Sequence, residues 1–247
     1  LDSILKNKSE NFEIILVDDG STDRLSNLIK LEYQNDLKYF KIDNRERGYA
    51  RNYGAQFAKG DYLNFFDSDD ICLPNHIKSA IKIIDDYSRP EVFHLSYNYQ
   101  SNNQVTKNTY NGIINKKIFN KNICSCNGVF IRADIFKDNK FDENRILSGV
   151  EDWDLWLRLA TKYKFYSFPD ITSTVINHDN RSMNSFNFDK ITNRFDYLLK
   201  ILNDNSHINL HKNEFKQIRA EIFSFKSLYA STDKRLIKFS LIFLFKS

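Results

Sequence analysis

The chain has 247 residues, of which 41% are hydrophobic and 15% aromatic, so it can bury a large core in one or two domains. Its 36 basic and 32 acidic side chains leave a formal net charge of +4, which is too small an excess to indicate a nucleic-acid-binding protein. The cysteines Cys72, Cys124 and Cys126 match neither a disulfide framework nor a common zinc spacing, and we expect ordinary thiols in a reducing compartment.

Strands and helices alternate over roughly the first hundred residues. Apolar runs predict strands at residues 12–18, 38–43, 61–66 and 91–97. Helical spacing predicts helices at 22–33, 49–59 and 74–86, with Ser21 or Thr22 as the first N-cap and Gly60 ending the second helix. This alternation predicts a Rossmann-like α/β fold with a mostly parallel sheet and helices on both faces.

The pattern loosens after residue 98. We expect a polar hairpin or loop at 102–115, a short strand at 127–132, an amphipathic helix at 150–163, and strands at 164–168 and 171–176. From residue 189 the spacing is helical to the end, with breaks near 203–209 and 231–233. We therefore predict a catalytic domain over residues 1–188 and a helical C-terminal extension over 189–247.

Three acidic clusters stand at positions where an α/β enzyme binds its ligand. Asp18 and Asp19 follow one strand, a second cluster at 67–70 follows another, and a third at 151–154 opens a helix. Carboxyl ends of strands border the ligand crevice of such a sheet. Carboxylates gathered there repel one another unless a cation or a proton-transfer role keeps them, which predicts a metal-dependent enzyme acting on a phosphorylated substrate.

The second cluster contains an Asp-x-Asp pattern at Asp67 and Asp69. Residues i and i+2 of an extended segment point the same way, so both carboxylates can serve one ion. Oxygen ligands of this kind suit Mg²⁺ or Mn²⁺ and leave coordination sites for phosphate.

Four segments resemble the signatures of family 2 glycosyltransferases, which have the GT-A fold. They are residues 12–23, 48–62, 67–70 and 149–158, and the resemblance covers about residues 1–180. The family normally has a strand and a nucleotide-contacting loop before the helix that ends here at Leu5. We expect the first strand to be missing from this sequence, and an N-terminally extended chain to be more stable.

The resemblance implies a nucleotide-sugar donor and a divalent cation. It assigns the base of the donor nucleotide to Asp19, the cation to Asp69, and the ribose or the waters of the metal to Asp67. It further implies donor or metal contacts for Ser21, Arg47, Arg51 and His178. Three alternatives stay open: Asp18 or Asp19 caps the following helix, Arg51 pairs with an aspartate of the second cluster, and His178 is an ordinary surface histidine.

Asp152 is our candidate for the general base of an inverting transfer, in which one carboxylate takes the proton of the acceptor hydroxyl. Glu151 and Trp153 are candidates for acceptor contacts. The alternatives are that Glu151 and Asp152 serve as ordinary helix N-terminal acids, and that Trp153 belongs to the core, where we also expect Trp156.

The sequence thus predicts an inverting glycosyltransferase of the hexosyl or N-acetylhexosaminyl type. We expect a UDP-sugar donor and a glycan or lipid-linked glycan acceptor in bacterial polysaccharide assembly. A non-catalytic glycan- or nucleotide-binding relative is the alternative, and a nucleotidyltransferase is a weaker one. The basic, apolar tail at 234–246 either packs on the catalytic domain or lies on the inner membrane surface, so we expect a cytoplasmic protein with peripheral contact at the membrane.

Overall fold

The computed structural model describes residues 1–8, 10–23, 25–33, 35–102, 104–178, 187–204 and 208–231. Its strands are β1 Ile15–Asp19, β2 Lys38–Ile42, β3 Tyr62–Asn64, β4 Ile71–Cys72, β5 Val92–Ser101, β6 Gln104–Asn108, β7 Gly112–Ile113, β8 Val129–Arg132 and β9 Phe165–Ile176. Its α-helices are α1 Asp2–Leu5, α2 Leu25–Leu28, α3 Glu46–Ala55, α4 His76–Asp86, α5 Asn115–Asn120, α6 Ala133–Asp138, α7 Glu151–Lys162, α8 Phe188–Asn203 and α9 Lys212–Ser231.

The described strands form two sheets. β1 and β2 pair in parallel, and a seven-stranded sheet has the order β3-β8-β5-β9-β4, with β6 added to β5 and β7 to β9. β5 and β9 are parallel over a long register, whereas the other pairs of the larger sheet are antiparallel. The predicted α/β fold is confirmed, and its sheet is more mixed than alternation alone predicts because short strands such as β6 and β7 return on β5 and β9.

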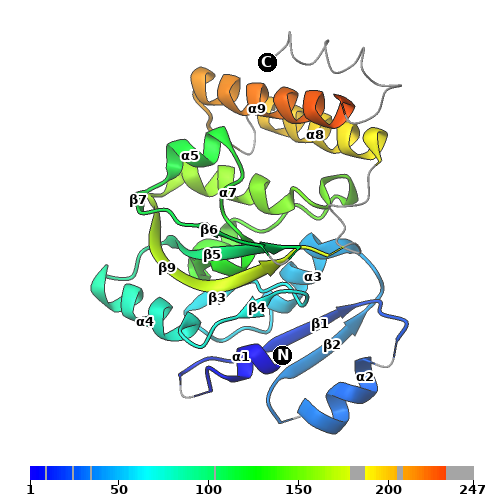
Figure 1. Cartoon of the computed structure of the whole chain (residues 1–247), viewed down its shortest axis with the longest axis vertical. Helices are drawn as coiled ribbons and strands as arrows, with labels where there is room; N and C mark the ends of the chain where they lie inside the picture. The colour runs from blue at the N-terminus through cyan, green and yellow to red at the C-terminus, as the bar shows by residue number, and fades with distance from the viewer. Residues whose placement is uncertain are drawn as a thin grey trace.

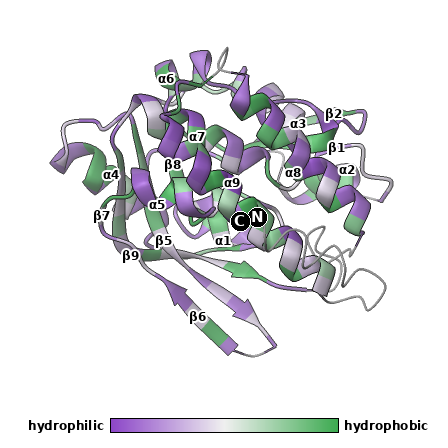
Figure 2. Cartoon of the chain, turned by 90° about the horizontal axis from the view of Figure 1, so that it is seen from above, coloured by the Kyte–Doolittle hydropathy of each residue, from purple (hydrophilic) through white to green (hydrophobic). Residues whose placement is uncertain are grey.

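The molecule is layered. Figure 1 shows α8 and α9 at one end above α5 and α7, with the larger sheet below them and α4 on its other side. Seen from above in Figure 2, the hairpin of β5 and β6 projects from the body. The side chains of β6 are largely exposed, in agreement with the polar hairpin expected near residues 102–115.

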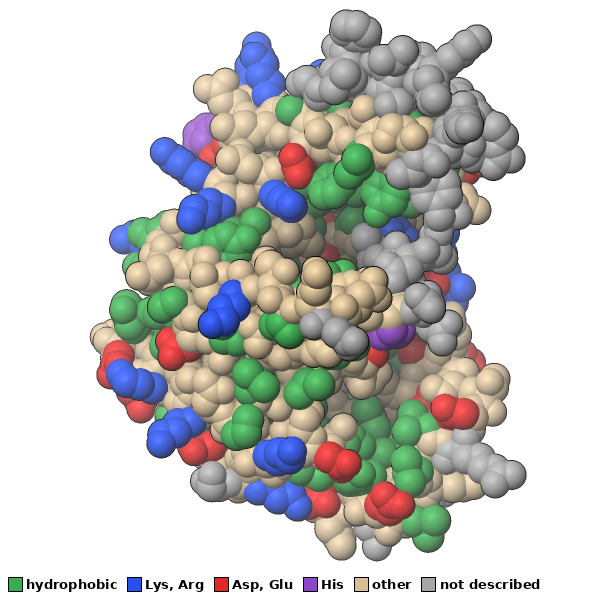
Figure 3. Space-filling view, in the orientation of Figure 1, with side chains coloured by type: hydrophobic (Ala, Val, Ile, Leu, Met, Phe, Trp, Pro, Cys, Tyr) green, Lys and Arg blue, Asp and Glu red, His purple; other side chains and the backbone are tan. Residues whose placement is uncertain are grey.

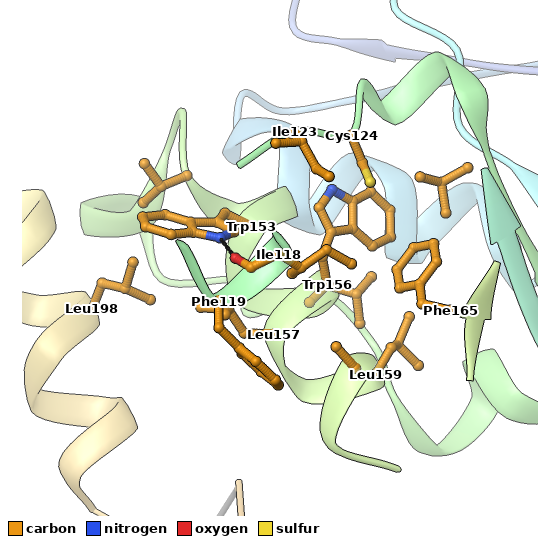
Figure 4. Close-up of a cluster of buried hydrophobic side chains, with 14 of the residues drawn as sticks. Ile118, Phe119, Ile123, Cys124, Trp153, Trp156, Leu157, Leu159, Phe165 and Leu198 are labelled. Atoms are coloured by element: carbon orange, nitrogen blue, oxygen red, sulfur yellow. Dashed lines mark hydrogen bonds between the residues drawn. The ribbon is translucent and has the colours of Figure 1, made fainter. Parts of the chain in front are cut away.

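The larger of two hydrophobic clusters in the described part of the chain joins the helical layer to the sheet. Trp153 and Trp156 of α7, both 1% or less exposed, share this core with Phe165 of β9 and with Leu198 of α8 and Ile222 of α9. Figure 4 shows Leu198 reaching this cluster from α8. The two C-terminal helices therefore bury their apolar faces against the rest of the chain. The division into a catalytic domain over residues 1–188 and a C-terminal extension stays a prediction.

Several predicted elements differ from those observed. The helix expected at 22–33 is α2 followed by a π-helical turn at Ile29–Tyr33. The backbone amide of Leu25, the first residue of α2, donates to the carboxylate of Asp23, so Asp23 caps the helix instead of Ser21 or Thr22. The strands expected at 164–168 and 171–176 are one strand, β9, with an irregular register in its middle.

The second helix, α3, begins at Glu46 and ends at Ala55, well before the predicted stop at Gly60. The backbone amides of Lys59 and Gly60 donate to the carboxylate of Glu13 instead. These bonds draw the chain out of the helix and toward the start of the N-terminal sheet.

Candidate active site

The second acidic cluster lies in the turn after β3. Oxygens of Asp67, Asp69 and Asp70 all lie within 4.8 Å of one another. Asn127 holds this turn, because its Oδ1 accepts from the amide of Asp67 at 2.8 Å and its Nδ2 donates to Asp70 at 2.7 Å. The other oxygen of Asp70 accepts from the amide of Ile176 at the end of β9, at 2.9 Å. Asp70 is thus a buried anchor, while Asp69 faces outward.

Asp69 has a histidine beside it. The Nε2 of His178 lies 3.0 Å from Oδ2 of Asp69, and both side chains are more than a third exposed. Carboxylate oxygens are the ligands that Mg²⁺ and Mn²⁺ prefer, and an imidazole is compatible with the softer Mn²⁺. These side chains therefore fit a divalent-cation site, and Asp69, His178 and Asp67 would supply its protein ligands.

Arg51 joins the second acidic cluster to the third. From α3, its Nη2 donates to Asp67 Oδ1 at 2.7 Å and its Nη1 donates to Glu151 Oε1 at 2.8 Å. The side chain is only 12% exposed and lies over the ring of Phe141. The pairing of Arg51 with the second cluster, left open by the sequence, is therefore observed. Its contact with the donor nucleotide stays a prediction.

Glu151 opens α7 and is 3% exposed. Its second oxygen accepts from the amide of Gly149, whose φ of 97° lies in the left-handed region that glycine tolerates. Both oxygens of Glu151 are therefore occupied by groups of the protein. This arrangement orients Arg51, and acceptor binding by Glu151 stays untested.

Asp152 lies beside Glu151 in the first turn of α7. Its Oδ1 accepts from the amide of Trp153 at 2.7 Å and from Nδ2 of Asn122 at 3.2 Å. Burial, reinforced by the charge of Glu151 and opposed by Arg51, raises the pKa of Asp152 from the ordinary 3.8 to about 7. A carboxyl group with this pKa can both release and accept a proton near neutral pH, which is the property of a general base.

The turn after β1 is built around a buried carboxylate. Oxygens of Asp18 accept from the hydroxyl of Tyr39 at 2.6 Å and from the amide of Ser21 at 2.7 Å. Burial by itself would raise the pKa of Asp18, but these hydrogen bonds and the charge of Lys41 outweigh it, and the pKa is lowered. Asp18 therefore stabilises the turn as a carboxylate.

Asp19 stands on the more open side of this turn. One of its oxygens accepts from the amide of Arg45 at 2.7 Å. Gly20 makes the turn possible, since its φ is 80° and a Cβ would come within 2.8 Å of the amide nitrogen of Asn44. Arg47 is half-buried in the first turn of α3. Nucleotide binding by Asp19, Ser21 and Arg47 stays a prediction.

Trp153 is a core residue in this structure. Its side chain is 1% exposed, and its Nε1 donates to the carbonyl of Ile118 at 2.9 Å, as Figure 4 shows. This burial supports the packing alternative for Trp153, and Trp156 lies in the core as predicted.

The three cysteines are buried free thiols, which confirms that they form no disulfide framework.

Sequence reasoning missed Asn127 and Asn122, which contact the acidic clusters from 57 and 30 positions away. Neither asparagine belongs to a pattern that marks a functional residue. Only the packing of the segment 122–128 against β3 and α7 reveals them.

The fold and the site together define a class: an α/β protein in which Arg51 ties an acidic turn at the end of a strand to a helix start that carries a carboxyl group able to exchange a proton. Solved structures with bound nucleotide sugars share this fold. The chain aligns with S. aureus TarS in complex with UDP-GlcNAc over 98% of its length and 84% of that chain, with a TM-score of 0.63 and 18% identity. It aligns with the Pyrobaculum calidifontis mannosyltransferase PcManGT in complex with GDP-Man and Mn²⁺ over 98% of its length and 68% of that chain, with a TM-score of 0.60 and 12% identity.

The chain belongs to glycosyl transferase family 2, whose model matches residues 1–139. An uncharacterized glycosyltransferase of Rickettsia conorii is 33% identical over 65% of this chain and 27% of that protein. The minor teichoic acid biosynthesis protein GgaB of Bacillus subtilis is 27% identical over 55% of this chain and 16% of its own length. The chain thus spans about a quarter of the length of the Rickettsia relative and less of GgaB.

Among the described residues, no helix is both long and apolar enough to cross a membrane. The tail at 234–246, for which we expect either membrane contact or packing, lies outside the described residues.

Proposed function

We propose that this chain carries out an inverting sugar transfer from a nucleotide-diphosphate donor, a UDP-sugar, to a glycan or lipid-linked glycan acceptor. The observation that carries the proposal is the ion-pair bridge of Arg51, which ties the acidic turn at Asp67 to the helix start at Glu151. This bridge holds Asp152 close to the carboxylates suited to a cation. A donor diphosphate at the turn and an acceptor hydroxyl at Asp152 would then meet.

The chemistry proposed for Asp152 is proton transfer. Asp152 accepts the proton of the acceptor hydroxyl while that oxygen attacks the anomeric carbon, and the bond from this carbon to the diphosphate breaks on the opposite face. A pKa of about 7 makes Asp152 a stronger base than an ordinary aspartate and leaves a large fraction of it ionised at neutral pH. Asn122 orients the carboxylate through its hydrogen bond to Oδ1.

The remaining roles concern the donor. A bound Mg²⁺ or Mn²⁺ would neutralise the charge of the leaving diphosphate. We assign its ligation to Asp69, with Asp67 and His178 beside it. In the proposal Asp19 accepts from the N–H of the uracil, and Ser21, Arg47 and Arg51 complete the nucleotide site. Glu151 keeps Arg51 in place, and the acceptor contact expected of Trp153 is confined to the cavity that its side chain lines at the start of α7.

The solved neighbours support a nucleotide-sugar donor and a divalent metal. TarS is described in complex with UDP and with UDP-GlcNAc, and PcManGT with GDP-Man and Mn²⁺. GgaB is named for teichoic acid biosynthesis. By analogy we propose a hexosyl or N-acetylhexosaminyl transfer in bacterial surface-polysaccharide assembly, by a cytoplasmic protein in peripheral contact with the membrane.

The test is a panel of UDP- and GDP-sugars incubated with the chain, with Mn²⁺ or with EDTA. We expect release of UDP from one donor in the presence of Mn²⁺ only, and NMR of the transferred sugar should show an inverted anomeric configuration. Tight binding of a nucleotide sugar without any turnover would support the non-catalytic alternative. Retention of configuration would rule out the base assigned to Asp152.

A further inference from the structure

A cavity of about 90 Å³ opens beside the start of α7 and reaches under the C-terminal helices. Figure 3 shows the surface hollowed below the layer of α8 and α9. The residues that line it and matter here are Asn122, Trp153, Lys190, Arg194, Phe225 and Tyr229. The lining is mainly apolar, but two cationic side chains and the amide of Asn122 also reach it, and a purely apolar packing defect would lack them.

The cationic side chains belong to consecutive turns of α8. Lys190 is exposed, whereas Arg194 is only 6% exposed. The pKa of Arg194 is lowered, mainly by burial and also by the charge of Arg47. The charge of Glu151 opposes this shift. Glu151 also pairs with Arg51, so one buried carboxylate interacts electrostatically with both guanidinium groups. An anion entering the cavity would meet two positive side chains arranged one turn apart.

The cavity is also connected to the proposed base. Asn122 lines it and donates to Asp152 Oδ1 at 3.2 Å. The Oδ1 of Asn122 is buried and has no hydrogen-bond partner within the described part of the chain. A buried acceptor of this kind costs free energy unless a ligand supplies a donor. A hydroxyl group bound here would satisfy Asn122 and lie next to Asp152.

We propose that this cavity is the acceptor subsite and that the acceptor carries a phosphate ester near its reacting hydroxyl. Lys190 and Arg194 bind the phosphate, since ammonium and guanidinium groups are the usual partners of phosphate oxygens. The rings of Phe225 and Tyr229 contact the carbon skeleton, and Asn122 accepts from a hydroxyl group. The assignment rests on the proposed function, and it gives α8 and α9 a role in choosing the acceptor.

The experiment titrates the 247-residue chain with sn-glycerol 3-phosphate and, separately, with glycerol, by calorimetry in the presence of EDTA. EDTA removes divalent cations, so that no cation at the aspartate turn can retain the phosphate. We expect glycerol 3-phosphate to bind at least about tenfold more tightly than glycerol, because the phosphate adds charge-assisted hydrogen bonds.

Two variants of α8 locate the binding. Lys190→Glu should weaken glycerol 3-phosphate binding by about tenfold, because it places a negative charge, which repels the phosphate, at the mouth of the cavity. Lys200→Glu makes the same change at an exposed position of α8 outside the cavity lining, and it should leave the affinity within about twofold. Arg194→Lys, which keeps the charge of the buried residue, should give an intermediate loss, and a thermal melt of each variant reports on its folding.

Equal affinity for the two probes, or equal effects of Lys190→Glu and Lys200→Glu, would overturn the acceptor subsite. A separate titration of the unchanged chain with UDP and Mn²⁺ tests the proposed function. If the unchanged chain does not bind UDP, the function on which the subsite rests is overturned. If it binds UDP but the two α8 variants have the same affinity for glycerol 3-phosphate, only the subsite is overturned.

Discussion

Arg51 donates a hydrogen bond to Glu151, with 2.8 Å between Nη1 and Oε1, although 100 positions separate the two residues in sequence. The same guanidinium holds Asp67 at 2.7 Å. One largely buried arginine therefore fixes the distance between the acidic turn after β3 and the first turn of α7. A reaction that uses both the acidic turn and the start of α7 therefore depends on Arg51.

Replacing Arg51 with alanine should therefore be costly for stability. Removing one member of a buried ion pair leaves an uncompensated charge, and we expect a loss of about 3–5 kcal/mol in the free energy of unfolding, measured by urea denaturation. Lys8→Ala, which breaks the exposed pair between Lys8 and Asp36 at the same 2.7 Å, should cost less than about 1 kcal/mol. Similar losses in the two variants would show that the bridge is structurally unimportant.

Asp69→Ala should abolish the cation-dependent part of UDP binding. Asp69 faces outward beside His178, whereas Asp70 is occupied by hydrogen bonds of the protein. Calorimetry with UDP and Mn²⁺ measures the effect, and Asp134→Ala, an exposed aspartate in the first turn of α6, provides the control. Unchanged affinity in the Asp69 variant would refute its assignment as a metal ligand.

Asp152→Asn keeps the size of the side chain and removes its ability to accept a proton. Turnover should fall by about two to four orders of magnitude while donor affinity changes little. In the unchanged enzyme the rate should rise about tenfold per pH unit below the pKa of about 7 and level off above it. If the variant retains more than a tenth of the activity, another residue is the base.

The raised pKa of Asp152 also predicts how stability depends on pH. Below about pH 4 the carboxyl group is protonated in both the folded and the unfolded chain, so it contributes no pH dependence. Between about pH 4 and the folded pKa of about 7 only the unfolded chain ionises fully, so the folded chain is progressively disfavoured. Asp152→Asn should therefore gain stability relative to the unchanged chain as the pH rises over this interval, measured by urea denaturation, and a constant difference would contradict the raised pKa.

Gly20→Ala should destabilise the turn after β1. The φ of 80° strains any residue with a Cβ by about 1–3 kcal/mol, and the new methyl group would meet the backbone of Asn44 at 2.8 Å. Gly60→Ala is the matched control, because its Cβ would find its nearest neighbour at 3.4 Å. We expect the control to change the melting temperature little and the Gly20 variant to lower both the melting temperature and the UDP affinity. Equal melting temperatures would show that the turn tolerates a side chain.

Local sequence was sufficient for much of the fold. The alternation of apolar runs and helical spacing predicted most strands and helices, because the period of side-chain burial is a property of a few consecutive residues. Boundaries failed where a distant group intervened. Glu13 captures the amides that would have continued α3 to Gly60, and the pairing of β5 merges two predicted strands into β9.

For the site, the sequence by itself determined which carboxylates are available, since Asp67, Asp69 and Asp152 lie in short acidic motifs whose chemistry can be judged from residue type and spacing. The tertiary structure alone decided what surrounds them. It selected pairing with Asp67 and Glu151 among the possible roles of Arg51, and it placed Trp153 in the core. It also brought Asn122 to Asp152 and Arg194 to the neighbouring cavity. These choices depend on burial and on contacts between residues far apart in the chain, and the energies of charges and buried polar groups are set by those surroundings.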